Sequence, residues 1–578
     1  MCGIIGYVGQ RDAYPLLLTG LERVEYRGYD SVGICTTDGT LHLLKEVGRV
    51  EQFKNKRLPG KQGIAHSRWA THGGVSQKNA HPFIAHDAFA LVHNGIIENY
   101  LELKEELIEK GVVFSSDTDS EVILHLVVGH YQHGPDKNLL AAVQQAVKQL
   151  QGAYAFAVLN KDAEEIVAAR DGCPLLVGIG ERENFIASDA TAFIEHTQKV
   201  VYVDDFEIVR VTKDALELFD HDGAKKNVSI VEVRGNIEVA QKQGHPHFML
   251  KEIMEQPQTI AETMKVELPR IGRPKRILIV ACGTASYAGL LGKYILEKFA
   301  KIPVVHETAS EFRYQEPLFY PDDLVIAITQ SGETADTLAA IRLAKKHGMK
   351  TLGIINVRES TIAREVDQVI YTRAGPEIGV ASTKAFTAQL IVLYKLAFQL
   401  GGKKFEGKGI ATLIEETLKL EDRIKEIAQK YVHNNHFLYI GRNLFYPLAL
   451  EGALKLKEIS YIHAEAYPAG ELKHGPIALI SEDMPTIAIC PRHETYEKMF
   501  SNIQEIKARQ GKIIALASTG DERMREISDD IIYLPKADGL LTPLLVAVAL
   551  QLFAYHLAAL RGCDIDKPRN LAKSVTVE

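Results

Sequence analysis

Residues 324–348 read LVIAITQSGETADTLAAIRLAKKHG, a short apolar run followed by a polar turn and then a helical pattern. This order is typical of a βαβ unit around a parallel sheet. Two more apolar runs, RILIVACGT at 276–284 and KTLGIINV at 350–357, lie on either side of it. From about residue 247, the chain is therefore expected to be α/β with doubly wound parallel sheets, and ligands should bind at the carboxyl ends of the strands.

The same pattern occurs a second time further along the chain. TIAIC at 486 matches VIAIT at 325, KIIALA at 512 matches TLGIIN at 351, and DDIIY at 529 matches DQVIY at 367. A nearly constant offset over several strands predicts a duplicated domain. We place the two copies at 265–405 and 430–568, followed by a C-terminal tail at 569–578.

One apolar segment imitates a membrane span. Residues 540–560 read LLTPLLVAVALQLFAYHLAAL, but Thr542, Pro543, Gln551 and His556 interrupt them. In the duplication this segment corresponds to residues 380–400, which contain two lysines. We therefore expect a buried core helix and no membrane partner.

The first 220 residues have a different pattern, in which short strand-like runs such as GIIGYVG, SVGICTT and YAFAVLN alternate with helical segments such as 100–110. This mixture predicts a layered α/β domain rich in sheet, at 1–220. The polar stretch that follows, 221–246, ends in a region of Gly and Pro typical of a linker.

Composition narrows the classes of function. The 578 residues include 67 Lys and Arg against 74 Asp and Glu, a net charge of −7, which argues against a nucleic-acid partner. The six cysteines form no CxxC pair, and the histidine pairs lack a third ligand nearby, so we expect reduced thiols, a cytoplasmic location and no metal. The N-terminus has no pattern of a signal peptide.

Cys2 directly follows the initiator Met, and removal of Met1 would make it the N-terminal residue. A free α-amino group has a pKa of about 7.7 to 8.0, so a useful fraction is unprotonated near neutrality. One residue could thus supply both a thiol nucleophile and a general base. By position alone, an ordinary small residue at the chain start is the better interpretation.

The surrounding motifs distinguish these alternatives. MCGIIGYVG (1–9), YRGYDSVGI (26–34), HSRWATHGG (66–74), HNGIIENY (93–100) and SDTDSE (116–121) occur in that order. Together with NAHPF, they resemble the N-terminal-nucleophile glutamine amidotransferases. The resemblance implies an αββα sandwich that hydrolyses glutamine through a thioester on the cysteine.

The resemblance also assigns roles to individual residues. Asn94 and Gly95 would stabilise the oxyanion, as fixed donors do in acyl transfer. Arg68 would bind the α-carboxylate of glutamine and Asp119 its α-ammonium group, a pairing that suits their charges. The remaining residues of the glutamine pocket would be Arg27, Trp69, Thr71 and His72.

The duplicated half resembles sugar isomerase (SIS) domains, which bind phosphosugars through Ser- and Thr-rich turns after parallel strands. In TQSGETADT, backbone N–H groups at a helix N-terminus could hold a phosphate without a lysine, although SGET alone could be a helix cap. The resemblance implies a sugar-phosphate site formed by Thr284, Thr329, Gln330, Ser331, Thr334, Val380, Ser382 and Ala572.

Across nearly its whole length, the chain resembles the isomerising glutamine:fructose-6-phosphate aminotransferases, or glucosamine-6-phosphate synthases. The segments at 450–476 and DKPRNLAKSVTVE at the C-terminus carry this resemblance. It implies that Lys573 forms an imine with the ketose, Glu458 moves a proton between two sugar carbons, and His474 assists ring opening. It also implies a homodimer, an ammonia channel and no cofactor.

Two rival hypotheses remain to be compared. A sugar-phosphate sensor with decayed catalytic residues would not be expected to retain Cys2, Glu458, His474 and Lys573 together. A phosphoribosyl amidotransferase would need a pyrophosphate-binding loop, where this chain has paired isomerase domains. Departures from the family pattern, such as Ala285 in place of a serine, affect the expected affinity more than the reaction type.

Overall fold

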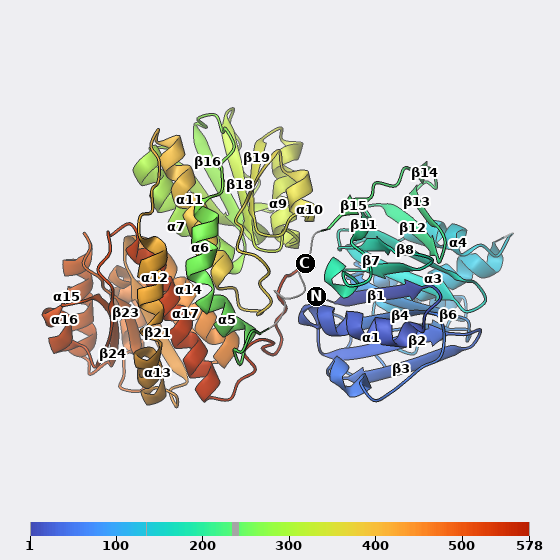
Figure 1. Cartoon of the computed structure of the whole chain (residues 1–578), viewed down its shortest axis with the longest axis horizontal. Coiled ribbons are helices and arrows are strands. Elements are labelled where there is room, and N and C mark those ends of the chain that lie inside the picture. The colour runs from blue at the N-terminus through green and yellow to red at the C-terminus, as the bar shows by residue number, and fades with distance from the viewer. Residues whose placement is uncertain (1, 135, 234–241, 577–578) are drawn as a thin grey trace. The chain divides into compact units, whose positions relative to one another are not determined.

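The fold is that of a computed structural model that describes residues 2–134, 136–233 and 242–576. The chain divides into two compact units (Figure 1). The first contains the chain up to Val239 together with the C-terminal segment from Ala572, and the second runs from Ala240 to Leu571. Each unit has its own hydrophobic cores.

The described part of the first unit contains two antiparallel sheets. The eight-stranded sheet has the order β15 (Val231–Glu232), β11 (Lys199–Tyr202), β9 (Leu176–Ile179), β10 (Asn184–Ala187), β1 (Gly3–Val8), β4 (Gln62–Arg68), β2 (Ser31–Thr37) and β3 (Leu41–Val47). The seven-stranded sheet has the order β14 (Lys225–Lys226), β13 (Leu216–Asp220), β12 (Glu207–Thr212), β8 (Glu165–Asp171), β7 (Tyr154–Asn160), β6 (Phe89–Gly95) and β5 (Phe83–Ala85).

Helices cover the outer faces of both sheets. They are α1 (Ala13–Val24), α2 (Tyr100–Glu109), α3 (Ser120–His133) and α4 (Leu139–Val147). Helix α1 packs on β1 and β4, whereas α3 and α4 pack on the other sheet. Small and branched side chains such as Ile4, Val92 and Ala155 fill the space between the sheets. These four layers confirm the predicted αββα sandwich, and the helix predicted at 100–110 is α2.

The second unit contains two parallel five-stranded sheets with the same strand order. The first is β17 (Val304–Thr308), β16 (Arg276–Ala281), β18 (Asp323–Thr329), β19 (Lys350–Ile355) and β20 (Gln368–Tyr371). The second is β22 (His463–Pro468), β21 (His436–Gly441), β23 (Thr486–Ile489), β24 (Ile513–Ser518) and β25 (Asp530–Leu534). In each sheet the second strand of the repeat lies at one edge, followed by the first, third, fourth and fifth strands. This shared order confirms the predicted duplication.

Helices lie on both faces of each parallel sheet, as Figure 1 shows for α7 and α9 beside β16 and β18. The helices of this unit are α5 (Phe248–Met254), α6 (Gln256–Met264), α7 (Gly283–Ala300), α8 (Ala309–Phe312), α9 (Ala335–Lys346), α10 (Thr361–Glu365), α11 (Lys384–Leu400), α12 (Ile410–Leu418), α13 (Glu421–Lys430), α14 (Tyr446–Ser460), α15 (Tyr496–Lys507), α16 (Glu522–Ile527) and α17 (Thr542–Leu560). The sheets are doubly wound, as predicted.

Helix α17 is the segment that imitates a membrane span. It is long and apolar enough to cross a bilayer, but 89% of its most apolar window is buried inside the protein. It packs against α13 and α14 in the core shared by the two repeats. The predicted core helix is therefore confirmed.

The segment predicted as a linker, 221–246, contains the two-residue strands β14 and β15. Strand β14 pairs with β13, and β15 pairs with β11, so this segment extends both sheets of the first unit. Residues 234–241 lie outside the described residues. The domain limits proposed from the sequence otherwise stay predictions.

Candidate active sites

Cys2 immediately precedes β1, the strand at which the first sheet approaches the loop after β4. The backbone N–H of Trp69 donates to the Cys2 sulfur at 3.2 Å. Burial raises the pKa of the Cys2 thiol, and the Trp69 N–H and the Arg68 guanidinium oppose part of this increase. The thiol therefore needs a base to become a nucleophile near neutral pH.

Two side chains hold the backbone of Cys2. Arg27 Nε donates to the Cys2 carbonyl at 3.2 Å, and Asn94 Nδ2 donates to the same oxygen at 3.0 Å. Arg27 is buried and also pairs with Asp189 at 3.7 Å. Arg27 thus links the Cys2 backbone to Asp189.

The predicted oxyanion donors lie at the end of β6. The Asn94 side-chain oxygen accepts a hydrogen bond from His66 Nε2 at 3.0 Å, which turns the amide nitrogen toward Cys2. Gly95 has a φ of +135°, and a Cβ there would lie 2.1 Å from the Ala153 carbonyl oxygen, so only glycine fits. Burial lowers the pKa of His66 to about 3, so this donor is neutral.

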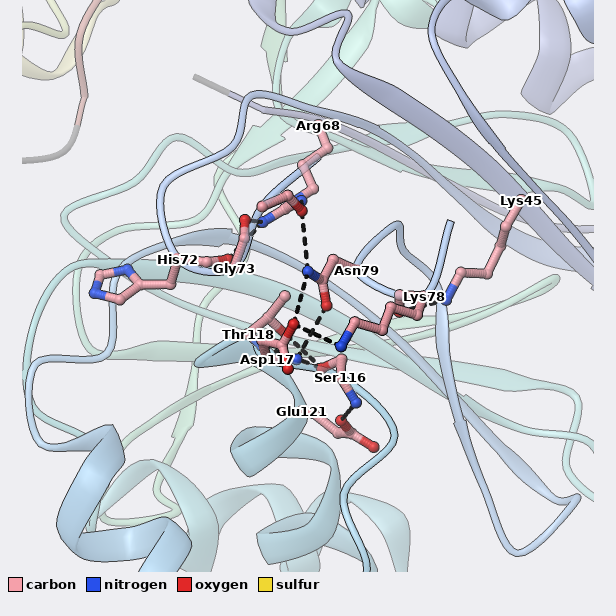
Figure 2. Close-up of polar contacts among 11 residues, drawn as sticks. Lys45, Arg68, His72, Gly73, Lys78, Asn79, Ser116, Asp117, Thr118 and Glu121 are labelled. Carbon is pink, nitrogen blue, oxygen red and sulfur yellow. Dashed lines mark hydrogen bonds and ion pairs between the residues drawn. The ribbon is translucent and has the colours of Figure 1, made fainter. Parts of the chain in front are cut away.

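Arg68 ends β4 and folds back onto the loop that follows it (Figure 2). Its Nη2 donates to the carbonyl oxygens of His72 at 2.5 Å and Gly73 at 2.9 Å. Thr71 is exposed on this loop, and the half-buried His72 packs edge-on against Tyr100 at 5.1 Å. Figure 2 shows the His72 ring directed away from Arg68.

Asp119 is buried at the N-terminus of α3. Its carboxylate accepts from the Ile97 N–H at 2.8 Å and from the Ser120 hydroxyl at 3.3 Å. Burial lowers the pKa of Arg68, and the charges of Cys2, Asp119 and Asp30 oppose this effect. Cys2, the predicted nucleophile, and the two predicted anchors for glutamine therefore interact electrostatically.

In the second unit, the predicted phosphate site lies in the turn after β18, which is held by its own hydroxyl groups. Thr329 Oγ1 accepts from the Gly332 N–H at 3.1 Å, and the Thr329 and Thr334 hydroxyls lie 3.2 Å apart. Ser331 Oγ accepts from the Glu333 N–H at 3.2 Å. Gln330 follows Thr329 in this turn, at the carboxyl end of the parallel strand and directly before α9.

The loop before α11 is held by carboxylates. Ser382 Oγ donates to Glu377 at 2.8 Å, and Glu377 also accepts from the Thr383 N–H at 2.8 Å. Glu252 of α5 accepts from the backbone N–H of Gly379 at 3.2 Å, and the Val380 N–H donates to the Asp566 carbonyl at 3.2 Å. The loop with Val380 and Ser382 is therefore fixed from both ends.

Helix α14 carries a buried charge cluster around Glu458. Lys455 Nζ lies 2.6 Å from Glu458, 3.6 Å from Glu451 and 2.9 Å from Thr284 Oγ1. Spacings of three and four residues place these groups on one face of the helix. Burial raises the pKa of Glu451 to about 8, which Lys455 partly opposes. The cluster joins Thr284 of the first repeat to Glu458 of the second.

Three predicted residues are not part of this cluster. His474 is exposed at the end of a 3-10 helix (Ala469–His474). Among the described residues, His474 makes no contact with Glu458. Ala572 and Lys573 belong to the C-terminal segment that groups with the first unit. In this segment, the Thr576 carbonyl accepts from Cys173 Sγ at 3.9 Å.

Several residues that contact the predicted site residues were not predicted from the sequence. Asp30, in the motif YRGYD, accepts from the Ala70 N–H at 2.8 Å and so holds the loop after Arg68. Lys455 contacts Glu458 and Thr284, and Glu451 accepts a hydrogen bond from the Thr284 hydroxyl. Their spacing from Glu458 on one helix was a signal that could have identified them.

Comparison with known proteins agrees with the division into a first unit and a second unit made of two repeats. A family model described as "SIS domain" matches residues 271–398 and 430–561, and one described as "Glutamine amidotransferase domain" matches residues 66–195. A solved C-terminal domain of glucosamine-fructose-6-phosphate aminotransferase from Francisella tularensis is 40% identical, with a TM-score of 0.53. It covers 56% of this chain and 99% of its own.

Full-length relatives are also similar. Proteins named glutamine--fructose-6-phosphate aminotransferase [isomerizing] are 49% identical in Chlorobaculum tepidum, 48% in Thermus thermophilus and 47% in Aquifex aeolicus. Each alignment covers 100% of this chain and 100% of the relative. The chain therefore belongs to the family of isomerising glutamine--fructose-6-phosphate aminotransferases.

Proposed function

We propose that this chain converts D-fructose 6-phosphate and L-glutamine into D-glucosamine 6-phosphate and L-glutamate. The observation that carries the proposal is that one chain contains both a cysteine pocket with glutaminase geometry and a carboxylate cluster in a sugar isomerase fold. Family membership over the full length supports the pairing of these two activities.

The first half-reaction is hydrolysis of the glutamine amide. After loss of Met1, the α-amino group of Cys2 takes the thiol proton, and the sulfur attacks the amide carbon. Asn94 and the Gly95 N–H stabilise the oxyanion, at about 3 kcal/mol for each donor. Ammonia leaves with a proton, and water then releases glutamate from the thioester. Arg68 and Asp119 bind the two charged groups of the substrate, with Trp69, Thr71 and His72 beside them.

The second half-reaction takes up the ammonia. His474 assists ring opening of the sugar phosphate, and Lys573 condenses with the C2 ketone to form an imine, with loss of water. Ammonia displaces the lysine from this imine. Glu458 then removes a proton from C1 and returns it at C2, while the C1 hydroxyl proton passes to the imine nitrogen, which converts the ketose imine into the 2-amino aldose.

The sugar phosphate is bound without a lysine on the phosphate. The hydroxyls and N–H groups of the turn at 329–334 support a phosphate site at the start of α9. Thr284, Val380, Ser382 and Ala572 complete the proposed pocket. We further infer a channel for ammonia, a homodimer and a cytoplasmic location, as the family resemblance implies.

A coupled assay tests the proposal. Purified protein is incubated with L-glutamine and fructose 6-phosphate, and glutamate and hexosamine phosphate are measured together. Equal amounts of both products are expected from the native chain. Cys2→Ala should form neither product, whereas Glu458→Gln should still release glutamate. Full hexosamine synthesis by Cys2→Ala with glutamine as the sole nitrogen source would contradict the proposal.

A further inference from the structure

Asn79 lies in the segment between β4 and β5, and the proposed chemistry assigns it no role. Its side chain is only 1% exposed, yet it contacts two separate loops. Asn79 Nδ2 donates to the Gly74 carbonyl at 2.9 Å, and Asn79 Oδ1 accepts from the Asp117 N–H at 3.0 Å (Figure 2). A single buried amide thus joins the loop after Arg68 to the loop before α3.

Each of these loops carries one proposed anchor for glutamine. Arg68 donates to the carbonyls of His72 and Gly73, so the guanidinium and its loop are held together. Asp117 precedes Asp119 by two residues. A shift of either loop would therefore change the distance between the group that takes the α-carboxylate and the group that takes the α-ammonium.

The loop after Arg68 and the loop before α3 are closely packed where Gly73 faces Asn79 and Asp117. Gly73 has a φ of +77°, and a Cβ there would lie 2.9 Å from Asn79 Nδ2 and 3.2 Å from the Asp117 carbonyl carbon. The approach of the two backbones therefore leaves space for the Asn79 amide but for no side chain at residue 73.

The acidic loop is anchored on its far side as well. Glu121 accepts from the backbone N–H groups of Ser115 at 2.8 Å and Ser116 at 2.7 Å. Burial opposes ionisation of Glu121, but these bonds and His125 outweigh it and lower the pKa to about 2. Asp119 is fixed to the Ile97 N–H. The loop before α3 is therefore fixed by hydrogen bonds on its far side, and Asn79 connects it to the loop after Arg68.

We propose that Asn79 is a positioning residue of the glutamine pocket. It sets the separation between Arg68 and Asp119, and thereby selects a substrate that carries a carboxylate and an ammonium on the same carbon. The inference rests on the proposed glutaminase function and deepens it. Asn79 affects binding of the α-carboxylate and α-ammonium groups of glutamine. Cys2, Asn94 and Gly95 instead take part in the reaction at the side-chain amide.

The exposed ion pair beside this contact provides a control. Lys78 lies 2.7 Å from the Asp117 carboxylate, but both side chains are 57% exposed. Solvent-exposed pairs contribute little to stability. Lys78→Ala therefore removes a contact to the same loop without removing the buried amide. Gln77→Ala, which removes a bond to the Lys45 carbonyl, is a second control on the same segment.

The experiment measures glutaminase kinetics of the full chain with three substrates: L-glutamine, glutaramate, which lacks the α-ammonium, and 4-aminobutanamide, which lacks the α-carboxylate. Asn79→Ala should raise KM for glutamine about tenfold, because the two loops lose the buried amide that joins them, with kcat changed less than about threefold. For the two truncated substrates, kcat/KM should change less than about threefold, because each uses one anchor. The rate of Cys2 alkylation by iodoacetamide should not change.

Asn79→Asp provides a second test if the alanine variant does not fold. It keeps the size of the side chain and the acceptor for the Asp117 N–H, but it loses the donor to the Gly74 carbonyl and to the Asp117 carboxylate, which lies 3.3 Å from Asn79 Nδ2. Because a second carboxylate then faces these oxygens, a KM increase at least as large is expected. An unchanged KM in a folded variant, or an equal loss for all three substrates, would overturn the inference. Failure of the native chain and Lys78→Ala to hydrolyse glutamine would instead overturn the proposed function and this inference with it.

Discussion

Two buried histidines near Cys2, the proposed nucleophile, are neutral at physiological pH. Burial lowers the pKa of His93 to about 4 and that of His66 to about 3. At neutral pH neither ring adds charge, and His66 instead uses an N–H to orient Asn94. A donor fixed before the reaction stabilises an oxyanion without reorganisation.

His66→Ala should therefore lower kcat for glutamine hydrolysis by about tenfold, because the Asn94 amide loses the bond that orients it. Asn94→Ala should cost more, on the order of 10² to 10³ in kcat. Steady-state glutaminase assays between pH 6 and 8, which lies above both histidine pKa values, should show the same ratio throughout. A His66→Ala enzyme with native kcat would contradict this role.

Glu451 gives a prediction on pH dependence. Its pKa in the folded protein, about 8, is above the ordinary value of 4.5. The resulting stabilisation is fully present below pH 4.5 and is lost as the pH rises through about 8. Glu451→Gln mimics the protonated acid, so its unfolding free energy should improve relative to the native protein from pH 5 to pH 9. Denaturant unfolding at these pH values provides the measurement, and a difference independent of pH would contradict it.

At the scale of elements, the turn between β18 and α9 depends on one glycine. Gly332 has a φ of +69°, and a Cβ there would lie 1.9 Å from Ser360 Oγ. The segment from Val357 to Ser360 thus packs directly under the proposed phosphate turn. The shape of this turn is set by a neighbouring loop as well as by its own hydroxyls.

Gly332→Ala should raise KM for fructose 6-phosphate by about tenfold or more while glutaminase activity without sugar is retained, because the turn must shift. Adding Ser360→Gly removes the steric conflict but not the strain of the positive φ. The double variant should therefore recover only part of the affinity. Full recovery would show that φ does not matter here, and a native KM in the single variant would contradict the proposed phosphate site.

Sequence alone predicted the elements whose signal is local. Apolar runs before helical patterns predicted the parallel strands, and the offset between repeats predicted α17 as a core helix. The strands β14 and β15 were missed because two residues carry no periodicity. Asn79 and Lys455 were missed because their importance comes from contacts between segments distant in the chain, which no local pattern reveals.

At the scale of the molecule, the two repeats of the second unit form one continuous core. Side chains of α7, α11, α14 and α17 contribute to it together. This shared core brings Thr284, at the start of α7, to Glu451 and Lys455 of α14. Duplication therefore allows one repeat to supply the proposed phosphate turn and the other the carboxylate that we propose for proton transfer.

The central claim is that the two units perform one reaction, in which the amide nitrogen of glutamine becomes the amino group of the sugar. The most direct measurement is mass spectrometry of the product formed from [amide-15N]glutamine and fructose 6-phosphate in the presence of unlabelled ammonium. We expect 15N in the hexosamine phosphate formed by the native chain and no 15N in any product of Cys2→Ala. Unlabelled hexosamine phosphate from the native chain, or labelled hexosamine phosphate from Cys2→Ala, would contradict this claim.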